Sequence, residues 1–205
     1  MLKLIALFTM VLDHLGYVFF PEHEWLRWIG RLTMPIFAYA IARGFHYTRD
    51  RRRYLIQIAI LALLSQGPYM LLFEQGWLLN MCVPWALSVL ALMAPRRYTP
   101  FVVLASVGLL VIPMDYSSLV ILLPLVIHRY WFEERRLWLA LGGSVAVLSL
   151  IALFSNPDQW FALLALPLIF LLEKYDRRVR LNKWLFYVFY PAHILLLWGV
   201  VQLIP

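Results

Sequence analysis

The sequence predicts an all-α protein, a polytopic integral membrane bundle of about nine helices. Two observations predict this fold class. Of the 205 residues, 63% are hydrophobic and only 14% are charged, and a soluble domain of this length cannot bury so much apolar surface. The apolar residues also fall into runs separated by short charged or Pro/Gly-rich breaks, which is the pattern of helices that lie in lipid.

Nine apolar runs set the expected helices. The first run is 3–20, which contains an ionisable pair. The second run, 26–44, and the third, 54–73, are separated by a basic segment. The remaining runs are 77–94, 99–113, 116–131, 136–154, 159–173 and 184–204. The fifth, sixth and eighth fall short of the ~20 residues that cross a bilayer, so we expect them to be little tilted, broken or partly inserted. No repeat or linker divides the chain, which predicts a single domain over residues 1–205.

The basic residues predict an orientation for these helices. If the breaks are assigned alternately to the two sides, 16 of the 18 Lys and Arg residues fall on one side. Only Arg27 and Arg31 lie towards the other, which carries Glu22, Glu24, Glu74, Asp115 and Asp158. Because cytoplasmic loops are enriched in Lys and Arg, this places residue 1 in the cytoplasm and residue 205 outside.

An ionisable pair, Asp13-His14, lies in the middle of the first run. An aspartate in hydrocarbon costs roughly 2.5–3.5 kcal/mol, so polar partners must compensate for it, and such pairs usually do chemistry or move ions. The other interpretation is structural, with the pair joining helices. Thr9, Asp13 and Tyr17 follow a four-residue step, so they should line one face of this helix.

Two further ionisable residues, Arg31 and His193, are expected near the depth of His14. At 1.5 Å per residue, His14 and Arg31 lie roughly 8–9 Å below the outer boundary, and His193 lies near mid-membrane. We therefore expect Asp13, His14, Arg31 and His193 to converge in one pocket. Asp13 would neutralise Arg31 and remain ionised, leaving His14 to exchange a proton. Two alternatives stay open: Arg31 extends to the outer headgroups, or His193 bonds a carbonyl that Pro191 frees.

The segment after the second run is more basic than orientation requires. Its arginines suit a phosphorylated ligand, since a guanidinium grips phosphate in a bidentate manner; anionic lipid is the alternative. The expected ligand-binding residues are Arg43, His46, Arg49, Arg51, Arg52 and Arg53.

Other polar and aromatic residues are expected to have structural roles. Asn80, Gln66 and Ser88 should form hydrogen bonds between helices, and internal prolines such as Pro35 free carbonyls that neighbours must satisfy. The tryptophans at the ends of the runs should form interfacial belts. These are Trp25, Trp28, Trp77, Trp131, Trp160 and Trp184.

Three stretches together resemble one known family. They are 5–17 with Phe19-Phe20-Pro21, 26–38 running into 43–49, and Phe189-Tyr190-Pro191-Ala192-His193. With Ser65-Gln66-Gly67-Pro68-Tyr69 and Asp115-Tyr116 between them, the chain resembles the TraX family end to end. The first two stretches match specifically, and the middle matches in hydropathy and scattered residues. Two positions depart from the pattern: Ser117 stands where glycine is usual, and Arg43 stands before Gly44 where an acidic residue is usual.

The resemblance implies a multi-pass acetyltransferase of the bacterial inner membrane. The family is known for N-acetylation of conjugative pilin, and related transmembrane acyltransferases use acetyl-CoA and an intramembrane histidine. His14 would be that histidine, with Asp13 and Arg31 as its neighbours. The donor would be cytoplasmic acetyl-CoA, its phosphates held by the arginine-rich segment. The acceptor would be an amine, such as a pilin N-terminus, or a hydroxyl at the outer half of the membrane.

Two other functions stay open at this point. A proton-coupled transporter or exporter could relay protons through Asp13, His14 and His193, although no internal repeat is visible. A non-catalytic membrane chaperone could hold a hydrophobic substrate, although it needs no deep ionisable cluster. The short loops offer no nucleic-acid-binding fold, no Cys/His spacing suggests a metal site, and one cysteine, Cys82, excludes an internal disulfide.

Overall fold

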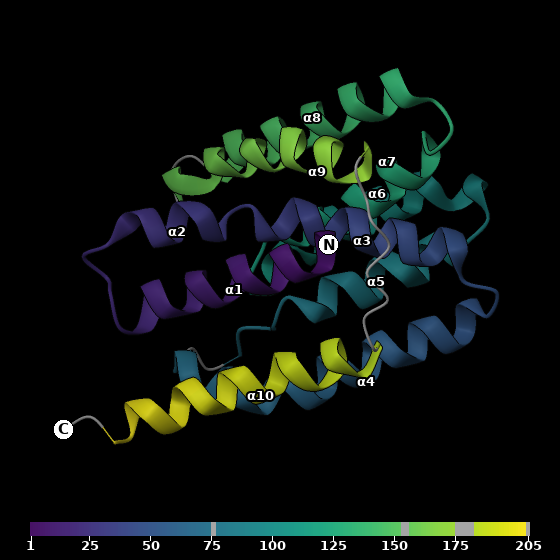
Figure 1. Cartoon of the computed structure of the whole chain (residues 1–205). Helices are drawn as coiled ribbons and strands as arrows, with labels where there is room; N and C mark the ends of the chain where they lie inside the picture. The colour runs from purple at the N-terminus through teal and green to yellow at the C-terminus, as the bar shows by residue number, and fades with distance from the viewer. Residues whose placement is uncertain (75–76, 153–155, 175–182, 204–205) are drawn as a thin grey trace. The chain divides into compact units, whose positions relative to one another are not determined.

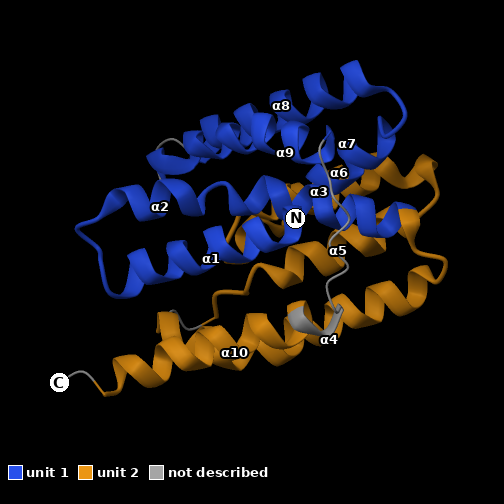
Figure 2. Ribbon diagram, in the orientation of Figure 1, with its two compact units in different colours: residues 1–46, 123–179 blue, residues 47–122, 180–205 orange. Residues whose placement is uncertain are grey.

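The computed structural model describes residues 1–74, 77–152, 156–174 and 183–203, with side chains in the last stretch from residue 186 on. These residues are almost entirely helical, with one isolated β-bridge between Leu79 and Met114, which confirms the all-α prediction (Figure 1). They form two compact units of interleaved segments (Figure 2). Unit 1 comprises residues 1–46 and 123–179, and unit 2 comprises residues 47–122 and 180–205.

The helices follow the apolar runs of the sequence closely. The α-helices are α1 (Leu2–Val18), α2 (Glu24–Gly30), α3 (Thr33–Tyr47), α4 (Arg51–Phe73), α5 (Cys82–Met93), α6 (Thr99–Gly108), α7 (Leu122–Arg129), α8 (Glu134–Ile151), α9 (Ala165–Lys174) and α10 (Lys183–Val201). The 3₁₀ helices are η1 (Arg96–Tyr98), η2 (Leu109–Val111), η3 (Ser118–Ile121) and η5 (Pro157–Leu164). Each of the three short runs contains a 3₁₀ stretch, so these segments are irregular as expected.

The second run was expected to be one helix over 26–44, and this expectation was wrong. It begins at Glu24 and is divided at Arg31 and Leu32 into α2 and α3. Pro35 supplies the physical reason. It has no N–H to donate to the carbonyl of Arg31, four residues earlier, and its ring clashes with that carbonyl. The division therefore falls next to a residue of the candidate site.

In unit 1, α1 packs along α2 (Figure 1). α8 packs against η5, and its Trp138 ring meets Phe170 of α9 edge to face. α1 approaches α2 closely because each helix carries a glycine at the contact, Gly16 on α1 and Gly30 on α2. A β-carbon at Gly16 would lie 2.7 Å from Leu26 Cβ, nearer than such atoms can approach. The two helices are thus held at a separation that only glycine permits at this point.

In unit 2, α4 packs against both α5 and α10. A buried amide network joins α4 to the segment before α5. Asn80 Nδ2 donates to the Ala62 carbonyl at 2.8 Å and to Gln66 Oε1 at 2.7 Å, and Gln66 Nε2 donates to the Leu78 carbonyl at 2.8 Å. Ser88 Oγ lies 2.8 Å from the Pro84 carbonyl oxygen and 3.1 Å from that of Ile121, so its one proton is shared between the two. The structural roles predicted for these three polar residues are confirmed.

Among the described residues, α4 is the one helix with both the length and the hydropathy to cross a bilayer. The apolar stretches Cys82–Met93, Ser118–Arg129 and Phe186–Val201 are shorter.

Candidate functional site

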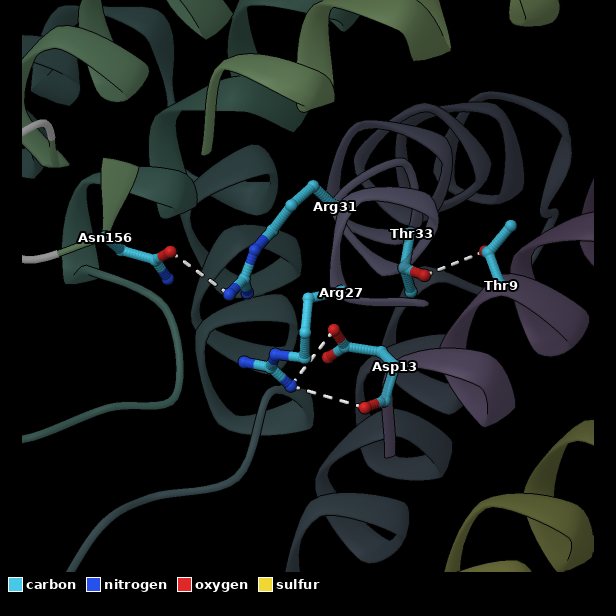
Figure 3. Close-up of polar contacts among 6 residues, drawn as sticks. All are labelled: Thr9, Asp13, Arg27, Arg31, Thr33 and Asn156. Carbon is cyan, nitrogen blue, oxygen red and sulfur yellow. Dashed lines mark hydrogen bonds and ion pairs between the residues drawn. The ribbon is translucent and has the colours of Figure 1, made fainter. Parts of the chain in front are cut away.

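An ion pair between α1 and α2 forms the centre of the site (Figure 3). Arg27 Nη1 lies 3.1 Å from Asp13 Oδ1 and donates to the backbone carbonyl of Asp13 at 3.3 Å. The Arg27 guanidinium also lies 5.1 Å from the centre of the Tyr17 ring. The side chains of Asp13 and Arg27 are only 14% and 23% exposed. The cation that contacts Asp13 is therefore Arg27, and the predicted pairing with Arg31 was wrong in this respect.

Arg31 lies at the end of α2 and is directed elsewhere (Figure 3). Its Nη2 donates to Asn156 Oδ1 at 3.1 Å, and only 5% of the residue is exposed. Burial at this level argues against extension of the side chain to the lipid headgroups. Arg31 nevertheless remains the second positive charge that acts on Asp13, because α2 carries both arginines on one face at a four-residue spacing.

η5 and Asn156, the residue directly before it, pack against α2. Trp28 Nε1 donates to Asp158 Oδ1 at 3.2 Å, and the Trp28 ring stacks on Phe161 with centroids 4.7 Å apart. Trp28 was expected to belong to an interfacial belt; its half-buried ring packs on Phe161, and the belt itself stays a prediction. Asn156 and Asp158 thus bring two polar side chains from far along the chain to the arginines and tryptophan of α2.

A hydroxyl pair continues the site towards α3. Thr9 Oγ1 and Thr33 Oγ1 lie 2.8 Å apart, and both residues are buried (Figure 3). Thr9 Oγ1 also lies 3.2 Å from the Ala6 carbonyl. Thr9, Asp13 and Tyr17 therefore all contact the segment 27–33, which confirms that they share one face of α1.

His14 is 6% exposed on α1. It follows Asp13, so its side chain leaves the helix about 100° away from the ion pair. Histidine is the side chain that proteins use most often for proton transfer. The site thus combines a buried histidine with an adjacent carboxylate that is ion-paired with Arg27.

His193 belongs to α10 in unit 2. Its Nδ1 lies 2.9 Å from the Phe189 carbonyl, and its ring stacks on Phe189 with centroids 5.1 Å apart. Because a carbonyl only accepts, Nδ1 carries a proton and the neutral ring keeps its lone pair on Nε2. The carbonyl that Pro191 frees is that of Tyr187, four residues before the proline. The carbonyl that His193 contacts is that of Phe189, so it is a different one. The predicted convergence of His193 with Asp13, His14 and Arg31 stays a prediction.

The residues predicted to bind a phosphorylated donor fall in both units. In unit 1, Arg43 forms an ion pair with Glu173, and the His46 ring stacks on Trp131 with centroids 4.9 Å apart. In unit 2, Asp50 caps α4 by accepting from the Arg53 N–H at 2.9 Å. The side chains exposed around this helix start are Arg49, Arg51, Arg52 and Arg53.

A family model described as TraX protein matches residues 1–201. The chain belongs to the TraX family. This TraX chain is 28% identical to a protein of Dichelobacter nodosus named as a probable fimbrial assembly protein FimC, serogroup H1; the match covers 96% of this chain and 92% of that protein. It is 31% identical, over 40% of its length and 32% of the other chain, to an uncharacterised protein of Rickettsia prowazekii (strain Madrid E). No solved structure matches it.

Sequence reasoning missed three residues of this TraX site: Arg27, Asn156 and Asp158. Arg27 carried a usable signal, since it stands four residues before Arg31 and so lies on the same helical face. Gly30 had a different expected role, since a backbone N–H near it was considered from the sequence as an oxyanion donor alternative to Arg31. Asn156 and Asp158 carried none, because they are 125 and 130 residues away from the side chains that they contact.

Proposed function

We propose that this protein is a multi-pass inner-membrane acetyltransferase. It moves an acetyl group from cytoplasmic acetyl-CoA to an acceptor amine, or to a hydroxyl, at the outer half of the membrane. The observation that carries the proposal is the buried His14 beside the Asp13–Arg27 ion pair in a chain that is 63% hydrophobic. TraX membership and the fimbrial name of the Dichelobacter relative favour a pilin N-terminus as the acceptor.

Exposed apolar side chains support insertion of more helices than α4. Phe8 on α1, Leu104 on α6 and Leu139 on α8 are 62%, 68% and 67% exposed. Exposed apolar surface on this scale is costly in water and costs nothing in lipid. Pairs of consecutive helices also replace single long ones, as α2 with α3 and η5 with α9 do, so helix length by itself undercounts the spans.

In the proposed reaction, His14 acts as general base towards the acceptor amine. The amine nitrogen attacks the thioester carbonyl while the imidazole takes its proton, and a tetrahedral oxyanion forms. The carbon–sulfur bond then breaks, the CoA thiolate leaves, and the imidazolium returns the proton to it. A covalent acetyl-His14 intermediate is the alternative route to the same products. A pocket within the bundle suppresses the competing hydrolysis of the thioester.

The oxyanion requires a donor, and the arginines of α2 are the candidates. The backbone N–H groups of Arg31 and Leu32 already donate to carbonyls of α2, at 3.1–3.2 Å, so the backbone near Gly30 is a poor choice. A guanidinium is charged and rigid, and such a donor stabilises a developing oxyanion strongly in a water-poor site. We assign this role to Arg31, while Arg27 fixes the position of the Asp13 side chain through their ion pair.

The donor is proposed to bind through its phosphates at the exposed arginines of the α4 start, Arg51, Arg52 and Arg53. Arg43 takes part only if its ion pair with Glu173 opens. Replacing the three α4 arginines together by glutamine should raise the KM for acetyl-CoA more than it lowers kcat. An unchanged KM would return them to the topological role of cytoplasmic basic residues.

The direct test compares two histidine variants in purified protein. His14→Ala should abolish acetyl transfer to a pilin peptide, measured by mass spectrometry of its N-terminus, and leave a monodisperse protein in detergent. His23→Ala, at an exposed position before α2, is the matched control and should transfer normally. Normal transfer by His14→Ala would sink the proposal. Proton-driven uptake in proteoliposomes without acetyl-CoA would instead support a transporter.

A further inference from the structure

An aromatic corner lies at one end of unit 1, and neither the ion-pair site nor the phosphate-binding arginines account for it. The end of α3 meets the turn between α7 and α8 there. The His46 ring stacks on Trp131, with centroids 4.9 Å apart and planes 24° apart. Phe132 stands across His46, with centroids 5.3 Å apart and planes 69° apart. Stacked His46 and Trp131 form one wall of the corner, and Phe132 forms the other.

The Trp131 ring is held in place by a second aromatic contact, on the side of unit 1. Its ring also stacks on Tyr39 with centroids 5.6 Å apart, and Tyr39 stacks on Trp138 of α8. Tyr39 is 4% exposed. This row of rings connects the corner to the core of unit 1. Trp131 is thus more than the isolated interfacial anchor that its sequence position suggests.

Phe132, in contrast, is 86% exposed. A membrane anchor is the simplest role for an exposed phenylalanine, but its neighbours in the turn oppose insertion into lipid. Glu133 and Glu134 follow Phe132 directly, and Arg129 and Arg135 stand three residues before and after it. Carrying these charges into hydrocarbon is costly. The exposed ring is better matched to a planar ligand that itself bears charge.

The charged residues around Phe132 indicate the sign of the charge that the ligand should carry. Glu133 is ion-paired with Arg136, so Glu134 opposes the exposed Arg129 and Arg135. Near the same end of α3, Arg43 is ion-paired with Glu173 and adds no net charge. The balance is positive, which favours an anion next to the rings.

We propose that this corner binds the adenine nucleotide end of the acyl-CoA donor. The base stacks on Phe132 against the His46–Trp131 wall, and Arg129 and Arg135 face the phosphate on the ribose. Stacking on aromatic rings is the general means by which proteins hold nucleobases, and cationic side chains beside them hold the phosphates. This inference rests on the proposed function, since it specifies where the donor's nucleotide lies.

The probe is adenosine 3′,5′-bisphosphate, the nucleotide end of CoA, titrated calorimetrically into the purified full chain in nanodiscs. Phe132→Leu keeps the apolar volume but removes the ring, and should weaken binding about tenfold, while Phe132→Trp should bind as the parent does. Trp77→Leu, at another highly exposed aromatic residue, is the control and should bind normally. Absence of binding by the parent chain, or equal affinity for Phe132→Leu and the parent, would overturn the inference.

A second arm separates CoA from other adenine nucleotides. ATP should bind more weakly than the 3′,5′-bisphosphate, and tighter binding of ATP would overturn the assignment to CoA. The transfer assay separates the two proposals. Phe132→Leu should raise the KM for acetyl-CoA and leave the KM for acetyl-pantetheine unchanged. If no thioester supports transfer while the nucleotide still binds at Phe132, the reaction is wrong and the nucleotide site stands.

Discussion

The side chain of Asp13 occupies the space where any residue other than glycine at position 30 would place its β-carbon. A β-carbon built on Gly30 would lie 2.2 Å from Asp13 Oδ1 and 2.4 Å from Asp13 Cβ. The absence of a side chain at Gly30 thus leaves the space that the carboxylate of Asp13 fills. Because Arg27 lies three residues before Gly30 on α2, the same contact presents Asp13 to its cationic partner.

Gly30→Ala is expected to displace Asp13 and to separate it from Arg27. A β-carbon cannot come nearer than about 3.0 Å to these atoms, so either the carboxylate rotates away or α1 and α2 move apart. Acetyl transfer should fall at least as far as in Asp13→Ala. The thermal unfolding temperature of the detergent-solubilised protein should fall as well, as for other overpacked sites that cost about 1–3 kcal/mol.

Two other glycines provide controls for this substitution. Gly16→Ala meets Leu26 rather than Asp13, so it should lower the unfolding temperature and preserve more activity than Gly30→Ala. Gly143→Ala on α8 meets nothing within 4 Å, and should raise stability by up to about 1 kcal/mol through helix propensity. Equal activity in Gly16→Ala and Gly30→Ala would show that only helix spacing matters.

The Asp13–Arg27 pair is expected to show strong coupling in a double-mutant cycle. Asp13→Asn or Arg27→Gln leaves one charge uncompensated, and each should cost about 3 kcal/mol, the lower end for buried pairs because both side chains keep some exposure. The double variant should recover much of that loss. Chemical unfolding followed by tryptophan fluorescence measures all four states. Additive losses would mean that the two side chains do not stabilise each other.

The sequence was sufficient to predict most of the helices and part of the candidate site. Polar residues in apolar surroundings, such as Asn80 and Gln66, can only be satisfied by other helices, so their role was predictable. The face of α1 that carries Thr9, Asp13 and Tyr17 was predictable for a similar reason, because helical periodicity fixes it. These inferences depend on local geometry and on the cost of an unsatisfied polar group, both of which are properties of the sequence.

The partners across helices were not predictable in the same way. Depth along the membrane placed Arg31 level with His14, but Arg27 and Arg31 share one face of α2, so the choice between them depends on what packs against each turn of that face. Arg27 meets Asp13 of α1, whereas Arg31 meets Asn156, the residue before η5. These contacts join residues far apart in the chain, and helical periodicity does not contain them.

The Thr9–Thr33 hydroxyl pair is expected to stabilise the contact between α1 and α3 modestly. A hydroxyl carries one proton, so Thr9 donates to the Ala6 carbonyl and accepts from Thr33. Thr33→Val keeps the shape and removes that donor, which should cost about 1 kcal/mol. Thr9→Val should cost more, because it deprives the Thr33 hydroxyl of its acceptor. Thr9→Val/Thr33→Val should be less destabilised than the sum of the two, as measured by thermal unfolding.

Asn80 is expected to be among the most sensitive structural positions of unit 2. It is fully buried; it donates to the Ala62 carbonyl and to Gln66 Oε1, and its Oδ1 accepts from the Cys82 N–H at 2.9 Å. Asn80→Ala leaves several buried groups unsatisfied, each costing about 1–3 kcal/mol. The variant should lose more stability than any single change at Thr9 or Thr33.

Two matched changes test whether the amide network of Asn80 is the cause. Gln202→Ala alters an exposed amide near the end of α10 and should leave the unfolding temperature unchanged. Gln66→Leu/Asn80→Leu removes both polar partners and replaces them with apolar volume, which should be less damaging than Asn80→Ala since fewer side-chain groups remain unpaired. If the double leucine variant were the less stable of the two, packing volume rather than hydrogen bonding would set the stability of this region.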